Sequence, residues 1–516
     1  MKHINDFRRG LRALVITLLA FGFALTGNPM AHAQDWWDHP YWPNAASVPT
    51  TGRPVPALAW LDEDMREFMQ ARSIPGGVMG IMRDGDIVYS RGFGHDYNKL
   101  SMPENTPLRL ASVSKTITVA AARHLISTGA LDLDDFAFDR GQTVQVGQFQ
   151  IIVGGILPSP KYAPFGTPAD NIEDITVSHL IHHRSGWYAG SHTAHMDFAF
   201  HDKDCAVAMG VASPPGATNK IRWIQGKPLA FVPGAGPQYS NINTLILSAV
   251  VEHVSGMELV DYVHTYVMRP AIGIPATEVF RGRTFREHQS PREPYYKTLN
   301  AKPSLATGPW IAPTVFDNYG PANVEVPYGG GDVEASAPFG SMVASPAAML
   351  IFADHYDLRL SMNEASTFGM PLTGPLPSPG GHTGSLDGYE SIIFQEDTAN
   401  NGAFRYFVAF NARSNSADFF PGHWPAVFLN AARPALVAMD WSTTTATSDG
   451  FWTRPGIELN FGVGGYNAPF WGFQRMLDKT TEGSKIRLMN GSQNWTGVID
   501  RAMVLDAPLG EVTLGQ

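Results

Sequence analysis

The sequence has very little cysteine: Cys205 is the single cysteine among 516 residues. One cysteine excludes an intramolecular disulfide, so the fold must be stabilised by a packed core. It also excludes zinc sites built from several thiolates, and none of the 17 histidines belongs to a His-Glu-x-x-His motif. We therefore predict that the protein uses neither a metal nor another cofactor.

Basic residues are also scarce. The chain has 37 Lys and Arg against 47 Asp and Glu, a net charge of −10 at pH 7. An acidic protein binds nucleic acid and anionic membranes poorly, so we predict neither as a partner. Beyond the N-terminal region, no stretch approaches the ~20 consecutive apolar residues of a membrane span.

The N-terminus has the pattern of a signal peptide. An apolar run, 13–26, follows a basic segment, and Ala31-His32-Ala33 fits the small-x-small rule for cleavage. The run is short for an uncleaved membrane anchor, and Arg8-Arg9 leaves twin-arginine export as a minor alternative. We predict that residues 1–33 are removed before Gln34, which changes the net charge to −13, and that the protein is periplasmic or secreted.

Hydrophobic periodicity predicts the main helices and strands. Asp84-Gly85 between two apolar runs, 77–82 and 87–90, predicts a β-hairpin. An alanine-rich apolar stretch from Ser112 to Leu125, followed by Gly129, predicts a buried helix. Other helices are predicted at 57–72, 176–183, 240–267 with a break at Ser255-Gly256, 347–356 and 424–439, and paired strands at 391–394 and 406–410. We expect a long loop at 141–174 and largely irregular structure at 270–340.

This order predicts a sheet assembled from both ends of one α+β domain, with helices on its faces and a mostly helical insertion. We place the domain at 57–439 and the insertion at roughly 116–345, after an N-terminal arm at 34–56. Residues 440–516 are rich in Ser, Thr, Gly and Trp. We predict that they form a separate, β-rich appendage, whose tryptophans pack rather than bind carbohydrate.

Ser112-Val113-Ser114-Lys115 is the first pattern that carries chemistry. A serine hydroxyl is a weak nucleophile and needs a base. Residues i and i+3 share one face of a helix, so Lys115 can reach the Ser112 hydroxyl. Burial disfavours the charged form of a lysine, which can then act as a base near neutral pH. Ser112 would lie at the helix start, where backbone N–H groups favour developing negative charge.

Two further patterns follow along the chain. In Tyr239-Ser240-Asn241, a phenol can carry protons and an amide can position a substrate. In His382-Thr383-Gly384-Ser385, a strand glycine permits close approach of a substrate backbone, and the Ser385 N–H can join the Ser112 N–H in an oxyanion hole. Each pattern alone is unspecific.

The fixed order Ser-x-x-Lys, Tyr-x-Asn, His-Thr-Gly resembles the serine β-lactamase-related, penicillin-binding hydrolases. That family includes class C β-lactamases, D-alanyl-D-alanine carboxypeptidases, family VIII esterases and D-aminopeptidases. The stretches 110–116, 175–187 and 339–346 also look like it, and the resemblance covers roughly 57–435. It implies a β-lactamase/transpeptidase-like fold.

The resemblance also implies roles. Ser112 would be the acylated nucleophile, Lys115 its base partner and Tyr239 a general acid/base, with the first proton acceptor left open. Asn241 would contact a substrate amide. His382, Thr383 and Gly384 would line the site, with the Ser112 and Ser385 N–H groups as oxyanion donors.

His382 bears on the substrate, because β-lactamases of this family usually carry lysine there, and histidine is mostly neutral at pH 7. We therefore predict first a peptidase or amidase acting on small, D-residue-containing or non-standard peptides. A carboxylic esterase, a β-lactamase and a non-catalytic penicillin-binding protein are the alternatives.

Two other clusters have structural explanations. His182-His183 is a candidate ligand pair, but adjacent side chains point apart, so we expect a buried, hydrogen-bonded histidine. Asp132, Asp134 and Asp135 follow a helix end, and we expect a solvated turn rather than a metal site.

Overall fold

The computed structural model describes residues 44–441 except 53, 97–99, 140–141, 147–148, 189–196, 269–271, 300–310, 319–321, 361–362, 364, 400 and 415–422. It also describes short segments between 451 and 514. The predicted signal peptide and residues 34–43 of the predicted arm lie outside the described residues.

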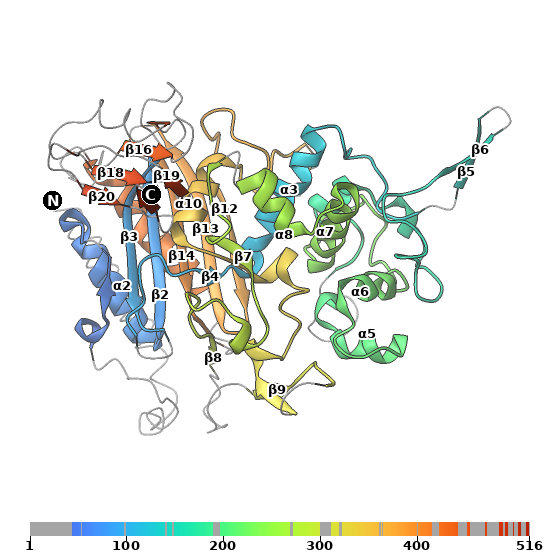
Figure 1. Cartoon of the computed structure of the whole chain (residues 1–516), viewed down its shortest axis with the longest axis horizontal. Coiled ribbons are helices and arrows are strands. Elements are labelled where there is room, and N and C mark those ends of the chain that lie inside the picture. Colours follow the sequence, from blue (N-terminus) through green and yellow to red (C-terminus); the bar gives the residue numbers. More distant parts are fainter. Residues whose placement is uncertain are drawn as a thin grey trace.

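A six-stranded antiparallel sheet combines strands from both ends of the domain, as predicted. Its order is β1-β3-β2-β14-β13-β12, and Figure 1 shows β3 to β12 following one another in this order. The bounds are Thr50–Thr51 (β1), Gly76–Arg83 (β2), Asp86–Gly94 (β3), Gly380–Leu386 (β12), Tyr389–Thr398 (β13) and Gly402–Phe410 (β14). Asp84 and Gly85 both have positive φ, which closes the predicted hairpin between β2 and β3.

Side chains alternate between the two faces of the sheet. Met79 and Ile81 of β2 belong to a core formed with α2 (Ala59–Arg72) and α11 (Trp424–Ala438). Val78 and Met82 belong to the larger core on the opposite face, where α10 (Pro346–His355) packs. The period of two places each residue of a strand on one face only. All three helices were predicted.

The helical part of the domain lies on the β12 side of the sheet (Figure 1). Its helices are α3 (Ser114–Ser127), α4 (Val177–Ile181), α5 (Asp202–Met209), α6 (Gly216–Ile224), α7 (Asn241–Ser255) and α8 (Leu259–Tyr262), which continues as a π-helical turn, Val263–Met268. The predicted break between α7 and α8 is confirmed, with Gly256 in the left-handed region at φ +69°.

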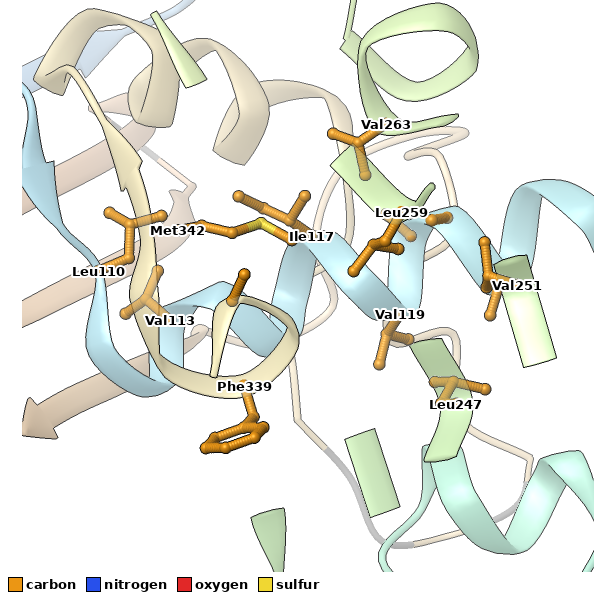
Figure 2. Close-up of a cluster of buried hydrophobic side chains, with 14 of the residues drawn as sticks. Leu110, Val113, Ile117, Val119, Leu247, Val251, Leu259, Val263, Phe339 and Met342 are labelled. Atoms are coloured by element: carbon orange, nitrogen blue, oxygen red, sulfur yellow. The ribbon is translucent and has the colours of Figure 1, made fainter. Parts of the chain in front are cut away.

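Helix α3 is buried at the centre of this part. Ile117 and Val119 of α3 pack in one cluster with Leu247 of α7 and Leu259 of α8, while Met342 covers the start of the helix (Figure 2). Packing on several sides fixes α3, and therefore the residues just before it, relative to the sheet.

The predicted long loop at 141–174 is wrong for its first part. Strands β5 (Gln142–Val146) and β6 (Phe149–Val153) form an antiparallel hairpin. The segment is rich in β-branched residues that alternate with Gln, which favours strands, whereas the Gly and Pro that follow it had suggested a loop.

Short strands also interrupt the region predicted to be largely irregular. They are β7 (Val279–Arg281), β8 (Lys297–Leu299), β9 (Ile311–Pro313) and β10 (Asn323–Glu325). Strand β11 (Met342–Ala344) pairs with β7 and with β4 (Leu108–Arg109), while β9 pairs with β10 and β8 with β15 (Ala412–Ser414). The β4–β11 pairing ties the segment before Ser112 to the segment before α10.

The described residues after Trp441 form six short strands. They are Phe451–Arg454 (β16), Phe470–Trp471 (β17), Lys485–Leu488 (β18), Gly491–Gln493 (β19), Val504–Asp506 (β20) and Val512–Leu514 (β21), and they pair in parallel. The boundaries of the arm, domain and appendage stay predictions. Within the described residues, no helix combines the length and apolar character that crossing a bilayer requires.

Candidate active site

Ser112 lies in a 3₁₀ turn, Ala111–Val113, immediately before α3. The α-helix therefore begins two residues later than the sequence pattern indicated. Ala111 has φ +46°, a backbone conformation that costs a non-glycine residue about 1–3 kcal/mol. Its methyl group is buried against Tyr296 and Tyr389, so tertiary packing holds the strained turn in place.

The Ser112 hydroxyl lies between Lys115 and Tyr239. Lys115 Nζ is 2.9 Å from Ser112 Oγ, and the Tyr239 hydroxyl donates to the same oxygen at 2.8 Å. Lys115 also donates to the carbonyl of Phe339 at 2.8 Å. The structure thus brings Tyr239 to two residues that precede it by more than a hundred positions in the sequence. It confirms the predicted reach of Lys115 across one helical turn.

Burial controls the charge of Lys115. Its side chain is 1% exposed, and desolvation holds the pKa of its amine well below the usual range, although the charge of Asp197 acts in the opposite direction. Its amine lies 4.9 Å from the centre of the Tyr239 ring. A lowered pKa makes the neutral amine available, which is the form that can accept a proton.

The opposite shift applies to Tyr239. Burial raises the pKa of its phenol well above the usual range, and this outweighs the hydrogen bond to Ser112. The phenol therefore keeps its proton over the physiological range. Lys115 and Tyr239 are a base and an acid whose environments push their pKa values apart.

Asp197 positions the Tyr239-Ser240-Asn241 segment. Its buried carboxylate accepts hydrogen bonds from the Ser240 hydroxyl at 3.0 Å and the Asn241 N–H at 2.6 Å. Asn241 is the first residue of α7. The sequence analysis missed Asp197, because no local motif links it to a tyrosine so far along the chain.

Strand β12 brings the His382-Thr383-Gly384-Ser385 segment against the Ser112 turn. A Cβ atom built on Gly384 would lie 2.8 Å from Ser112 N and 2.4 Å from the carbonyl oxygen of Leu110. Only glycine permits this approach. Gly384 therefore serves the packing of strand against turn, and the substrate access expected from the sequence stays a prediction.

Two buried histidines lie beside Tyr239. The centre of the Tyr239 ring is 6.4 Å from that of the His382 ring and 4.7 Å from that of the His183 ring. His382 Nδ1 donates to the Thr383 carbonyl at 2.7 Å, and burial lowers its pKa to about 4. Burial likewise lowers the pKa of His183 to about 3, and its Nδ1 accepts from Asn243 at 3.1 Å. Both rings are neutral at pH 7.

A cleft of about 1100 Å³ opens over these groups. The predicted residues that line it are Ser112, Tyr239, Asn241, His382, Thr383 and Ser385. Lys115 lies behind Ser112, and Gly384 lies against the Ser112 backbone, so both support the lining from beneath. All eight predicted site residues thus meet at one place.

The two clusters given structural explanations behave as expected. His182 is buried, and its Nδ1 donates to the Ser178 carbonyl at 2.8 Å. Asp132 and Asp135 form a turn in which Asp135 accepts the Asp132 N–H at 2.8 Å. Within the described part of the chain, no three His, Cys, Asp or Glu side chains are grouped as a metal site would require.

Residues 61–414 match the family model described as Beta-lactamase. Esterase EstB of Burkholderia gladioli is 30% identical over 241 residues, which are 44% of this chain and 53% of that protein. Penicillin-binding protein 4* of Bacillus subtilis (strain 168) is 27% identical over 211 residues, 40% of this chain and 38% of that protein. The chain thus spans about half, or less, of the length of these two relatives.

A solved structure of D-amino acid amidase from Ochrobactrum anthropi SV3, complexed with L-phenylalanine amide, gives a TM-score of 0.46. The two sequences are 16% identical, and the match covers 74% of this chain and 96% of the amidase chain. The family match spans well over half of the chain and includes both the Ser112 turn and strand β12. The chain therefore belongs to the Beta-lactamase family of serine hydrolases, and its α+β fold is the one that the resemblance implied.

Proposed function

We propose that the protein hydrolyses a small amide or peptide bond through an acyl-enzyme on Ser112, in substrates with D- or other non-standard residues. The observation that carries this proposal is the double contact of Ser112 Oγ, with Lys115 at 2.9 Å and Tyr239 at 2.8 Å. One contact reaches a lysine of lowered pKa and the other a phenol of raised pKa. Acyl transfer needs this combination of a base and an acid at one nucleophile.

In the first step, Ser112 Oγ attacks the carbonyl carbon of the substrate and its proton passes to the neutral amine of Lys115. A tetrahedral oxyanion forms, and the N–H groups of Ser112 and Ser385 are the proposed donors to it. Collapse breaks the bond to the leaving nitrogen, which takes the proton of the Tyr239 hydroxyl. Tyr239 recovers a proton from Lys115, and water then releases the acid from Ser112.

The protonated phenol favours an amide over an ester. An amine leaves poorly unless it is protonated, whereas an alkoxide or phenoxide needs less help. Tyr239 is held in place for this role by the segment that Asp197 anchors. Asn241, which lines the same cleft, is the proposed contact for the substrate amide.

A carboxylic esterase is the second candidate. The specific observation in its favour is the 30% identity with Esterase EstB of Burkholderia gladioli. The same Ser112 chemistry would serve an ester, with Tyr239 protonating an alcohol. A β-lactamase is less favoured, because the neutral ring of His382 does not supply the permanent charge expected for a β-lactam carboxylate.

The acidic character of the chain and its N-terminal pattern lead us to propose an exported protein that acts on small molecules. Export would place Ser112 outside the cytoplasm, where its substrates are peptides, amides or esters of that compartment. N-terminal sequencing of the protein purified from its host tests the proposed cleavage before Gln34.

The acyl-enzyme is tested by intact mass after treatment with a serine-reactive phosphonate. We expect one adduct on the wild type and on Ser114→Ala, whose serine lies two residues further on and is buried. We expect none on Ser112→Ala. The absence of an adduct on every variant would support the non-catalytic alternative.

The substrate class is tested by a panel of D-amino-acid amides, D-Ala-D-Ala peptides, p-nitrophenyl esters, nitrocefin and linear peptides. Each is measured against the Ser112→Ala background. The proposal requires kcat/KM on the best amide to exceed that variant's by about 10³-fold or more. Turnover of esters alone would select the second candidate.

A further inference from the structure

Part of the cleft is lined by residues of β13 and α11, next to the edge strand β12. Ile392 and Phe394 of β13 face α11 in the core on that side, and both line the cleft. We name this part the α11 arm. It is lined by Ser385, Ile392, Phe394, His423, Ala426 and Asn430.

A buried carboxylate lies next to the α11 arm, in contact with Ser385 of its lining. Glu390 is 2% exposed and accepts hydrogen bonds from the Ser385 hydroxyl at 3.0 Å and the Trp424 N–H at 2.9 Å. Trp424 is the first residue of α11, and a helix N-terminus favours a negative charge. His423 Nδ1 lies 3.7 Å from the same carboxylate.

This geometry fixes what Ser385 can offer to a ligand. Its hydroxyl proton is directed to Glu390, so the lone pairs of Ser385 Oγ remain for the cleft. A serine held in this way accepts hydrogen bonds and does not donate them. It therefore suits an N–H, an O–H or an ammonium group and repels the oxygens of a carboxylate.

The permanent cations of the cleft are already paired. Of the described residues that line it, Arg109 and Arg413 carry such a charge. Arg109 is buried, lies 3.2 Å from Glu293 and donates through its other nitrogens to two backbone carbonyls. Arg413 lies 3.1 Å from Asp387. Each guanidinium thus already has a carboxylate beside it, which compensates its charge and weakens its attraction for a substrate carboxylate.

We propose that the α11 arm selects a neutral or cationic group of the substrate and rejects a carboxylate. A bound anion would meet the acceptor oxygen of Ser385 and lie near the Glu390 carboxylate behind it, while Arg109 and Arg413 already have carboxylates beside them. Like charges close together weaken binding strongly. This inference rests on the proposed function. It narrows the substrates to neutral esters, amides and amino-acid amides, in place of substrates with a carboxylate beside the scissile bond.

Two matched substrate pairs test the inference. The first pair consists of two hippuryl thioesters, whose leaving group is either thioglycolate or methyl thioglycolate. The second pair consists of two p-nitrophenyl esters, whose acyl group is either succinyl or its monomethyl ester. Wild type should prefer the neutral member of the pair whose variable group enters the arm. Glu390→Gln should raise the ratio of anionic to neutral kcat/KM in that pair by roughly tenfold.

Glu396→Gln is the matched control. Glu396 lies on the same strand and face and is also buried, but it contacts Tyr406 and Arg433, whereas Glu390 contacts Ser385 of the cleft lining. It should leave both ratios unchanged. A ratio that Glu390→Gln leaves unchanged in both pairs overturns the inference.

The wild type gives an independent answer if Glu390→Gln does not fold. Hydrolysis of the anionic member at least as fast as the neutral one, in both pairs, overturns the inference while leaving the proposed function intact. If wild type and Ser112→Ala are equally inactive on these four substrates and on the amides and peptides of the panel, the proposed function is wrong and the inference falls with it.

Discussion

The carboxylate of Asp197 accepts the backbone N–H of Asn241 at 2.6 Å, and this bond fixes the start of α7 beside Tyr239. The same carboxylate raises the pKa of Lys115 against the larger effect of burial. Asp197 therefore joins two parts of the proposed site, the geometry of the phenol and the charge of the amine.

Replacing Asp197 should change the pH profile as well as the rate. Asp197→Asn keeps an oxygen acceptor but removes the charge that favours protonated Lys115, so the acid limb of kcat/KM should move to lower pH. We expect kcat to fall by about 10- to 100-fold, because a neutral acceptor holds the Tyr239-Ser240-Asn241 segment less firmly. Rate measurements from pH 4 to 9 check this. Asp204→Asn, an exposed change on α5, should leave the limb unmoved.

The wild-type profile should have an acid limb and no alkaline limb below pH 9. In the proposed mechanism activity needs neutral Lys115, so kcat/KM should rise with pH through the lowered pKa of that amine and then reach a plateau. Tyr239 keeps its proton over this range because burial raises its pKa. Lys115→Met should lower kcat by about 10²–10⁴-fold and abolish the limb. A limb that persists in Lys115→Met would assign it to another group.

Gly384→Ala should disable the site without unfolding the domain. The added Cβ would lie 2.8 Å from Ser112 N, so the Ser112 turn or β12 must shift. A shift of ~1 Å can lower the rate by about 10²-fold. Phosphonate labelling rates and thermal unfolding measure the two effects separately. Gly374→Ala, where an added Cβ meets nothing within 4 Å, is the control and should label normally.

Two buried histidines should make the fold sensitive to acid. His183 and His382 have folded-state pKa values of about 3 and about 4, below the 6.5 of an unperturbed histidine. The unfolded chain therefore binds more protons below pH 6.5. Stability is fully present above that pH and falls as the pH drops, by about 1.4 kcal/mol per pH unit for each histidine.

Denaturant unfolding at pH 7, 6, 5 and 4.5 measures this slope. His183→Asn should have a shallower slope than wild type, because only His382 of the pair remains to take up a proton. His288→Asn, which changes an exposed histidine, should keep the wild-type slope. A slope identical in all three proteins would show that His183 does not contribute.

Local patterns were sufficient for most of the fold, whereas the eight predicted site residues followed from the order of three patterns and the family resemblance that this order carries. Asp84-Gly85 marked a tight hairpin, and the spacing of Ser112 and Lys115 needed only the geometry of one helical turn. The hairpin at 142–153 was mistaken for loop, because the glycines and prolines beyond it outweighed its alternating pattern.

Other parts of the site depend on contacts that no local pattern contains. Asp197 and Glu390 act through Asn241 and Ser385, whose positions are set by tertiary packing. The left-handed backbone of Ala111 could not be read from an alanine, since the conformation is imposed by the rings packed on it. Sequence thus indicated the residues proposed to do chemistry more readily than those that hold them in position.

The pairing of β2 with β14 has a consequence for how the chain reaches this structure. Gly77 pairs with Phe410, so the two halves of the sheet are separated by the whole helical insertion in order of synthesis. Until β14 has been made, β2 has an open edge, which invites pairing with other chains. Such long-range pairing folds slowly. A nascent chain halted before residue 402 should therefore aggregate or recruit a chaperone, even though Ser112, Lys115 and Tyr239 have already been synthesised.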